Sequence, residues 1–352
     1  MENQKAMEII RNYSGRPVRI MEVCGTHTHA IFQYGIRQIL PDPVRLISGP
    51  GCPVCVTEPG YIDEAVELAL DKGAVIATFG DLVRVPGSSM SLQKARAEGA
   101  EVKVVYSPLD ALAYAKEHPE KQVVFLSVGF ETTAPAACLA VKKAKAEGIG
   151  NFYLLVANKT MDQAYRALAD SADAFLYPGH VSAITGMGIY RELVKEGISG
   201  AVCGFTPAEI LTALAVILTR LDRGETFAEN CYPRVVTEEG SRRGRALMRE
   251  TMEPCDVVWR GIGMIQRSGM RLNDAYREHD ARAAFGITQK TGRQNPACRC
   301  GDILMGRITP KECPLFGKAC TPEEPVGACM VSSEGTCSAY YKYRTVISSL
   351  SE

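Results

Sequence analysis

Two short motifs near the N-terminus contain residues that can bind metal or carry out redox chemistry. Residues 48–55 read SGPGCPVC, which places the thiols of Cys52 and Cys55 three positions apart behind a run of glycine and proline. Residues 24–29 read CGTHTH, which combines the thiol of Cys24 with the imidazoles of His27 and His29. Thiolates and imidazoles are ligands for zinc, copper and iron. The two motifs therefore predict a metal site, a redox dithiol, or both.

The spacing of Cys52 and Cys55 is compatible with three interpretations. A thioredoxin-type dithiol precedes a helix whose N-terminal dipole stabilises the thiolate, and a helix starting near Glu58 and Pro59 fits this arrangement because proline is favoured in the first turn. A metal half-site uses the same spacing with ligands from elsewhere. The third interpretation is a pair of inert, buried thiols. Convergence with Cys24, which follows a neighbouring predicted strand, favours a soft metal over a simple dithiol.

A second group of cysteines lies near the C-terminus, in a segment rich in glycine and proline. Zinc ribbons normally contain paired CxxC motifs, which this segment lacks, whereas four thiolates are the ligand set of iron–sulfur clusters. The segment therefore favours an all-thiolate iron–sulfur cluster, with structural zinc as the alternative. The four expected ligands are Cys313, Cys320, Cys329 and Cys337. Just upstream, Cys298 and Cys300 form a CxC pair that is either an accessory redox pair or a source of spare ligands.

Composition places the chain among ordinary globular proteins. Of its 352 residues, 46% are apolar and 23% charged, and the formal net charge is zero, so no electrostatic footprint for nucleic acid is present. No apolar run approaches the roughly 20 residues of a membrane helix, and the N-terminus lacks the apolar core of a signal peptide. We expect a cytoplasmic protein, where thirteen cysteines are more often metal ligands or catalytic groups than structural disulfides.

Short apolar runs alternate with amphipathic segments over the first two thirds of the chain. This alternation predicts parallel sheets covered by helices. The expected strands are residues 18–23, 44–48, 74–80, 101–106, 122–129, 152–157, 174–178 and 200–204.

The predicted fold is α/β, with two Rossmann-like parallel-sheet domains followed by a cysteine-rich, mostly irregular or helical iron–sulfur domain. A polar gap at 117–122 suggests a boundary between the first two domains. The expected domains span 1–120, 121–225 and 226–352, with the N-terminal residues as a candidate for packing against the last one.

Several motifs follow directly on the carboxyl ends of predicted strands, where open α/β sheets bind their ligands. Glu131 lies in FETTAP (130–135) and is a candidate helix cap, general base or binding group for a lysine of a partner protein. His180 and Ser182 lie in GHVSAITG (179–186). The chain contains no G-x-S-x-G nucleophile elbow and no P-loop, which argues against a serine hydrolase and a P-loop nucleotide site.

Five motifs in a fixed order resemble the HypD family of [NiFe]-hydrogenase maturation proteins. They are CGTHTH (24–29), GPGCPVC (49–55), GFETTAP (129–135), PGHVSAITG (178–186) and CPLFGKAC…GACMVSSEGTC (313–337). The resemblance implies a redox-active scaffold, rather than a free-standing metabolic enzyme, on which the Fe(CN)2CO group of the hydrogenase is assembled. It also implies a HypC-type chaperone and a HypE-type cyanide donor as partners, and two α/β domains joined to a [4Fe-4S] domain.

Carried over to this sequence, the resemblance assigns the iron-binding or redox thiols to Cys24, Cys52 and Cys55. It assigns the cluster to Cys313, Cys320, Cys329 and Cys337. His27 is then expected to steady a thiolate or deliver protons, and Glu131 and His180 to shape the cleft or the partner surface. Two other classes remain open: a stand-alone iron–sulfur thiol–disulfide reductase and a zinc-stabilised interaction module.

Overall fold

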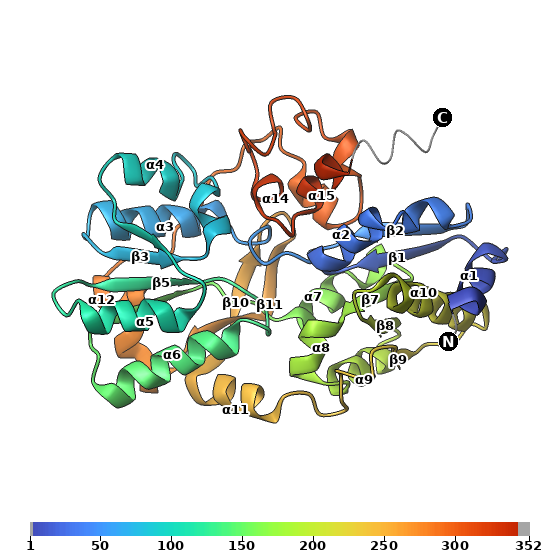
Figure 1. The fold of residues 1–352 in the computed structure, drawn as a ribbon, viewed down its shortest axis with the longest axis horizontal. Coiled ribbons are helices and arrows are strands. Elements are labelled where there is room, and N and C mark those ends of the chain that lie inside the picture. Colours follow the sequence, from blue (N-terminus) through green and yellow to red (C-terminus); the bar gives the residue numbers. More distant parts are fainter. Residues whose placement is uncertain (1–2, 344–352) are drawn as a thin grey trace.

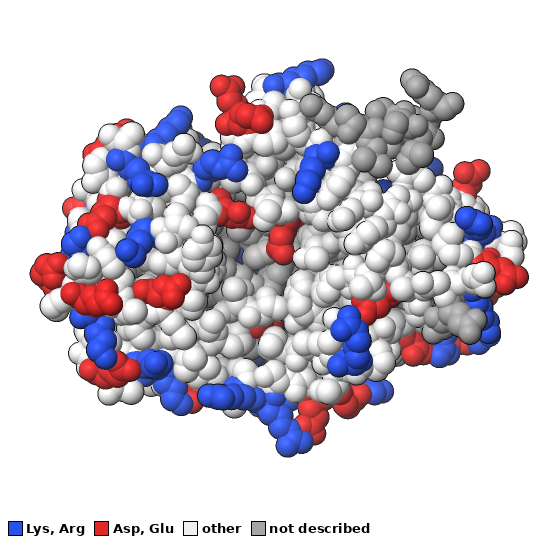
Figure 2. All heavy atoms as spheres, viewed as in Figure 1, with Lys and Arg blue, Asp and Glu red and all other residues white. Residues whose placement is uncertain are grey.

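The structure is a computed structural model that describes residues 3–343. Two α/β units lie side by side, a long β-hairpin runs between them, and the cysteine-rich C-terminal segment lies across their junction (Figure 1). Acidic and basic side chains are interspersed around the rim of the face in Figure 2, and the hollowed centre of that face is largely uncharged. Within the described part of the chain, no helix is both long and apolar enough to cross a bilayer.

The first unit is built on a five-stranded sheet, sheet A, with the order β2-β1-β7-β8-β9 and parallel pairing throughout. Its side chains alternate between two cores, as expected for a strand period of two. On β7, Leu176 packs with the core under α1 and α10, whereas Phe175 and Tyr177 face the core that adjoins the cysteine-rich segment. The strands are β1 Val18–Glu22, β2 Val44–Ser48, β7 Ala174–Pro178, β8 Gly200–Cys203 and β9 Ala228–Asn230.

The second unit is built on a four-stranded parallel sheet, sheet B, with the order β4-β3-β5-β6. Val124 and Leu126 of β5 pack against α3, while Phe125 packs against α5 and α6 on the opposite face. Both faces are covered, which explains why these strands are continuous apolar runs. The strands are β3 Val75–Thr78, β4 Val102–Val104, β5 Val123–Ser127 and β6 Phe152–Val156.

Helices connect the strands and cover the sheets. The α-helices up to the end of sheet A are α1 Asn3–Arg11, α2 Gly25–Gln33, α3 Pro59–Leu70, α4 Leu92–Ala97, α5 Pro108–Glu117, α6 Ala134–Glu147, α7 Met161–Ala167, α8 Gly179–Thr185, α9 Gly188–Lys195 and α10 Pro207–Asp222. The 3-10 turns are η1 Ile36–Ile39, η2 Gly80–Arg84, η3 Ala169–Ser171, η4 Asp274–His279 and η5 Pro310–Glu312.

All eight predicted strands are present and parallel, and the predicted α/β class is confirmed. The expected division at residue 120 does not separate the two sheets. It falls between β4 and β5, both of sheet B, while sheet A combines strands from residues 18–48 with strands from residues 174–230. The polar stretch at 117–122 is the exposed end of α5 and its turn into β5, so its polarity marks a surface loop rather than a break between sheets.

The pattern-based reading missed the hairpin of β10 (Met252–Trp259) and β11 (Gly263–Leu272), which follows α11 (Arg242–Thr251). Its strands mix polar and apolar residues, so they lack the apolar runs of the parallel strands. The hairpin contacts α7 and β6 and carries the buried Trp259 into the central core. It therefore links both units to the cysteine-rich segment.

The C-terminal segment is mostly irregular, as predicted, with the short helices α12 Ala281–Phe285, α13 Cys300–Leu304, α14 Ala328–Val331 and α15 Thr336–Lys342. It packs on sheet A through α15 and α2, where Phe32 and Tyr340 meet edge to face with ring centroids 4.5 Å apart. The N-terminal residues pack elsewhere: α1 lies against α10, because its buried face of Ala6 and Ile10 joins the outer core of sheet A. Helix α1 thus packs on sheet A rather than on the cysteine-rich segment.

Candidate functional site

The CGTHTH and GPGCPVC loops meet at one edge of sheet A. They leave β1 and β2, which are adjacent, parallel and in register. The Gly25 N–H donates to the Gly51 carbonyl at 3.2 Å. A Cβ on Gly51 would fall 2.3 Å from the backbone nitrogen of Cys24, so only glycine permits this approach. The two loops therefore lie against each other at this edge of the sheet.

A buried ion pair fixes the strand ends beneath these loops. The Glu22 carboxylate is fully buried and accepts hydrogen bonds from Arg37 at 2.5 Å and from the Ser48 hydroxyl at 2.8 Å. Burial raises the pKa of Glu22, and both partners act in the opposite direction. Sequence reasoning missed this network, although a glutamate inside an apolar strand requires a buried partner.

Cys52 and Cys55 are both buried and are joined as a disulfide, with their Cα atoms 5.3 Å apart. The Cys55 N–H also points at the Cys52 sulfur, at 3.1 Å. Helix α3 begins at Pro59 after Glu58, as predicted from the proline. The motif thus forms a disulfide close to a helix start.

Cys24 lies beside His180, with its sulfur 3.8 Å from the imidazole Nε2. The histidine comes from α8, at the end of β7, which pairs with β1. Burial raises the pKa of Cys24 to about 12 and lowers the pKa of His180 to about 4. In the metal-free protein the pair is therefore a neutral thiol and a neutral imidazole near pH 7.

The ring of Phe205 contacts the rings of both His27 and His180. Its ring centroid lies 4.9 Å from that of His27 and 5.1 Å from that of His180. The Nε2 atom of His27 is 2.9 Å from the Gly204 carbonyl, while its buried Nδ1 has no partner among the described residues. Burial lowers the pKa of His27 to about 4. Phe205 was not singled out from the sequence, although it lies directly after β8, at the carboxyl end of a strand.

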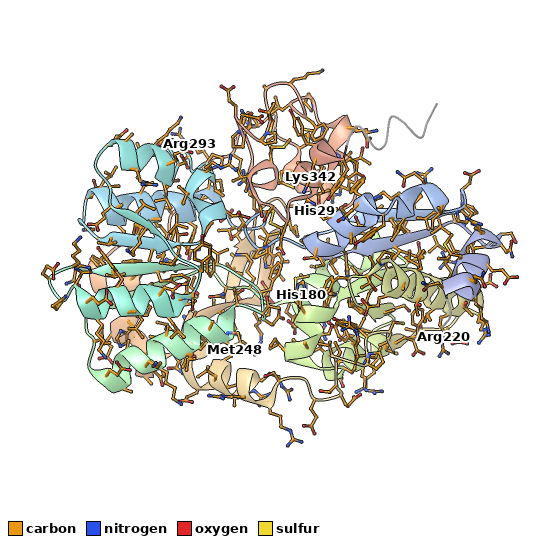
Figure 3. The ribbon with its side chains drawn as sticks, in the orientation of Figure 1. His29, His180, Arg220, Met248, Arg293 and Lys342 are labelled. Atoms are coloured by element: carbon orange, nitrogen blue, oxygen red, sulfur yellow. A yellow bond between two sulfur atoms is a disulfide. The ribbon has the colours of Figure 1, made fainter. Side chains whose placement is uncertain are left out.

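His29 lies apart from this group. Its ring is 5.8 Å from that of Tyr343, and Figure 3 shows it beside Lys342 of α15, above His180. Of the two histidines in CGTHTH, only His27 shares the Phe205 contact with His180.

Glu131 occupies a different pocket. One carboxylate oxygen accepts the Met161 N–H at 2.9 Å, and the other is buried without a partner among the described residues. Burial raises the pKa of Glu131 to about 7. The pocket is also lined by Thr160, Thr185 and Arg245, and neither Cys24 nor His180 belongs to it. The structure therefore does not bring Glu131 together with the cysteine loops.

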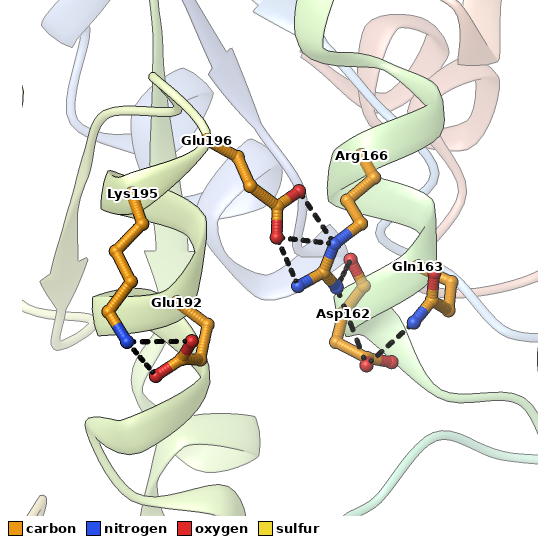
Figure 4. Close-up of polar contacts among 6 residues, drawn as sticks. All are labelled: Asp162, Gln163, Arg166, Glu192, Lys195 and Glu196. Carbon is orange, nitrogen blue, oxygen red and sulfur yellow. Dashed lines mark hydrogen bonds and ion pairs between the residues drawn. The ribbon is translucent and has the colours of Figure 1, made fainter.

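Helix α7, which begins at Met161, is held to α9 by Arg166. The Arg166 guanidinium binds the Glu196 carboxylate through two nitrogens and lies 3.6 Å from Asp162 one turn earlier (Figure 4). Such exposed pairs contribute little free energy individually. Their geometry nevertheless orients α7, whose first residue, Met161, donates its N–H to Glu131.

The C-terminal cysteines surround one small cavity, as the sequence predicted for four of them. Backbone N–H groups already point at two sulfurs: Cys337 N–H at Cys329, 3.2 Å, and Val326 N–H at Cys320, 3.4 Å. All the cysteines of the cavity are free. Together with apolar side chains, the cavity is lined by Cys298, Cys300, Cys313, Cys320, Cys329 and Cys337.

The donor set fits an iron–sulfur cluster better than a single zinc ion. The lining contains no His, Asp or Glu, and N–H groups directed at sulfur stabilise thiolates. In the described chain, no three His, Cys, Asp or Glu side chains converge on one ion-sized position. A cubane cluster binds each thiolate at a separate iron, so its ligands are spread more widely than those of one ion. The same observation means that Cys24, Cys52 and Cys55 do not form a ready-made three-ligand site.

The two cysteine regions share one buried core. Cys52, Cys55 and the cavity cysteines belong to the same continuous apolar cluster, together with Trp259 of the hairpin. The redox-capable groups of the two ends of the chain are thus separated by protein interior rather than by solvent.

Comparisons with known proteins agree with the motifs. The family model HypD, described as "Hydrogenase formation hypA family", matches residues 2–344. The chain is 43% identical over 338 residues to the hydrogenase maturation factor HypD of Rhodobacter capsulatus, covering 93% of this chain and 90% of that protein. It is 42% identical over 340 residues to the hydrogenase expression/formation protein HupD of Azotobacter chroococcum (93% and 90%). It is also 42% identical over 337 residues to HypD of Escherichia coli K12 (94% and 90%).

Proposed function

The chain belongs to the HypD family of hydrogenase maturation factors, and from that premise we propose that it is the scaffold on which the Fe(CN)2CO group is assembled. The observation that carries the proposal is the junction of the two loops on sheet A. It places Cys24, with His180 at 3.8 Å, against the glycine that precedes Cys52. Soft thiolates suit an iron ion that carries cyanide and carbonyl ligands.

The iron is the cargo in this proposal, and its protein ligands come from Cys24, Cys52 and Cys55. Because these three do not form a closed site by themselves, a further thiolate from a HypC-type chaperone would complete the coordination. A HypE-type protein would supply cyanide. The neutral state of Cys24 means that iron binding must displace its proton. The adjacent imidazole of His180, whose pKa of about 4 prevents it from keeping the proton near pH 7, would pass it on to solvent.

We assign the redox chemistry to the Cys52–Cys55 pair and to the cysteines of the C-terminal cavity, which share one buried core. A [4Fe-4S] cluster held by Cys313, Cys320, Cys329 and Cys337 would supply single electrons when bound. The Cys52–Cys55 disulfide takes up two electrons and two protons on opening to the dithiol. Opening frees both sulfurs for the iron, so the same pair serves in turn as redox couple and ligand. Cys298 and Cys300 line the same cavity and remain candidates for accessory redox groups.

Infrared spectroscopy of the protein purified with its small chaperone tests the iron site. We expect cyanide and carbonyl stretches in the wild type and in the control Cys231→Ala, and their loss in Cys24→Ala. Bands that persist unchanged in Cys24→Ala would refute the site. For the cluster, anaerobically purified protein should contain iron and acid-labile sulfide, and Cys313→Ser should lose the cluster's paramagnetic signal on reduction. Zinc without iron or sulfide would overturn the assignment.

The Cys52–Cys55 disulfide also supports a second candidate, a stand-alone iron–sulfur thiol–disulfide reductase. That function needs the dithiol but not Cys24. It predicts turnover of disulfide substrates that survives Cys24→Ala and is abolished in Cys52→Ala. The scaffold proposal predicts no such turnover in either protein.

A further inference from the structure

Arg260 lies at the tip of the β10–β11 hairpin and is only 2% exposed. Its backbone N–H donates to the carbonyl of Val56, the residue after Cys55, at 2.8 Å. On its other side, Gly261 has a φ of 78° and approaches so closely that a Cβ would fall 2.2 Å from the Cα of Gly301, the residue after Cys300. The tip is therefore held between the disulfide motif and the cysteine-lined cavity.

The Arg260 guanidinium has no hydrogen-bonded counter-ion; Glu58 is close enough for Arg260 to oppose the burial that raises the pKa of its carboxyl, but it makes no hydrogen bond to the guanidinium. Its Nε and Nη1 atoms are fully buried and have no hydrogen-bond acceptor among residues 3–343. Arginine stays charged in proteins, so burial cannot be relieved by loss of a proton. A buried, unpaired cation is costly unless an anion and acceptors are present. Two buried nitrogen atoms of Arg260 are thus available as hydrogen-bond donors to an anion.

The guanidinium lies at the wall of the cysteine cavity. Gly327, which lines the cavity, lies against both the Cys298 sulfur and the Nη2 atom of Arg260. A fixed cation at this wall favours negative charge on the sulfurs of the cavity.

We propose that Arg260 is a positioning residue that supplies the counter-charge and hydrogen bonds for the anionic iron–sulfur cluster of the cysteine cavity. This inference rests on the proposed function. Four thiolates make such a cluster anionic, and one-electron reduction adds a further negative charge. A fixed cation next to it stabilises the reduced form more than the oxidised form, which raises the reduction potential. The backbone of Arg260 is hydrogen-bonded to Val56, so the residue that carries this charge is anchored to the segment that follows the Cys52–Cys55 disulfide.

The neutral variant Arg260→Met keeps much of the side-chain volume and removes the charge. Arg260→Lys keeps the charge with a different donor geometry. Arg271→Met is the matched control, because Arg271 is an exposed arginine of the same hairpin that pairs with Glu253. The full-length proteins are purified anaerobically, analysed for iron and sulfide, and titrated with redox mediators while the paramagnetic signal is recorded.

We expect Arg260→Met to lower the equilibrium constant for cluster reduction about tenfold, which is about 59 mV for one electron. Arg260→Lys should shift less, and Arg271→Met should match the wild type. A fully loaded Arg260→Met protein with the wild-type potential would overturn the proposal. Wild-type protein that lacks iron and sulfide would instead refute the cluster itself, so the two failures are distinguishable.

Thermal unfolding provides a second readout that does not need a potential. In chelator-treated, cluster-free protein, Arg260→Met should unfold at a higher temperature than the wild type, because two buried nitrogen atoms without hydrogen bonds are gone. In protein that carries the cluster, Arg260→Met should instead unfold at a lower temperature than the wild type. Equal destabilisation of both forms would indicate a merely structural side chain and would overturn the proposal. If Arg260→Met does not load, iron and sulfide retained in Arg260→Lys support the charge requirement, and their loss there contradicts it.

Discussion

Glu131 offers a pH-dependent test of the buried electrostatics. Its carboxylate is 4% exposed, with one oxygen bonded to the Met161 N–H and the other without a partner among the described residues. Burial raises its pKa from 4.5 to about 7. The folded protein therefore binds more protons at this site than the unfolded chain between these pH values. The free energy of unfolding must therefore decrease as the pH rises from about 4.5 to about 7, and it stays constant above about pH 7.

The magnitude follows from the size of the pKa change. At about 1.4 kcal/mol for each pH unit, the change costs about 3 kcal/mol once the group is ionised in both states. For a chain of 352 residues this corresponds to roughly 4 °C in unfolding temperature. Glu131→Gln keeps an oxygen for the Met161 N–H and cannot ionise, so it removes the pH-dependent cost but adds a constant one for the buried amide.

The assay is thermal unfolding of the wild type and Glu131→Gln from pH 5 to pH 8.5. The unfolding temperature of the wild type relative to the variant should fall by roughly 4 °C over this range. Glu147→Gln is the control, because Lys116 holds the pKa of that exposed carboxylate low and it stays ionised throughout. Parallel curves for the wild type and Glu131→Gln would refute the reasoning, since they would show that the buried carboxylate has an ordinary pKa.

Three further predictions concern the loops on sheet A. Gly51→Ala should destabilise the protein by about 1–3 kcal/mol and weaken iron binding, because its Cβ meets the backbone of Cys24, whereas Gly150→Ala, which meets no neighbour, should be neutral in thermal unfolding and iron titration. Arg37→Met should cost about 3–5 kcal/mol in denaturant unfolding, because it leaves the Glu22 carboxylate buried and unpaired; a loss below about 1 kcal/mol would contradict the buried pair. The thiol of Cys24 should give no thiolate absorbance below about pH 10 in metal-free protein, measured as wild type minus Cys24→Ser at 240 nm, and a signal at pH 7 would show that burial does not control it.

Local sequence patterns were sufficient to predict the strands of the first two thirds of the chain and the chemistry of the motifs. The apolar runs identified all eight strands of the first two thirds, because both faces of a parallel sheet are buried and the pattern records that burial. Pro59 marked the start of α3. The spacing of the C-terminal cysteines anticipated a common cavity for four of them. The hairpin at 252–272 was missed because its strands carry no such pattern.

Pairing between distant segments was not accessible from those patterns. β1 pairs with β7, more than a hundred residues later, and this pairing is what brings His180 to Cys24. An apolar strand can pair with any other apolar strand, so its composition does not specify its neighbour. Only burial of complete sheet faces selects the arrangement, and the same selection separates Glu131 from the cysteine loops.

The sequence alone therefore determined the family, the α/β class and the residue types able to bind iron or exchange electrons. The tertiary structure decided which of them act together: it joined the loops of Cys24 and Cys52 through the cramped Gly51, enclosed six cysteines rather than four in one cavity, and placed Arg260 between the two. The physical reason is that local order depends on the burial pattern of neighbouring residues. Charge compensation and loop contacts depend on side chains that only the complete fold brings within a few ångströms.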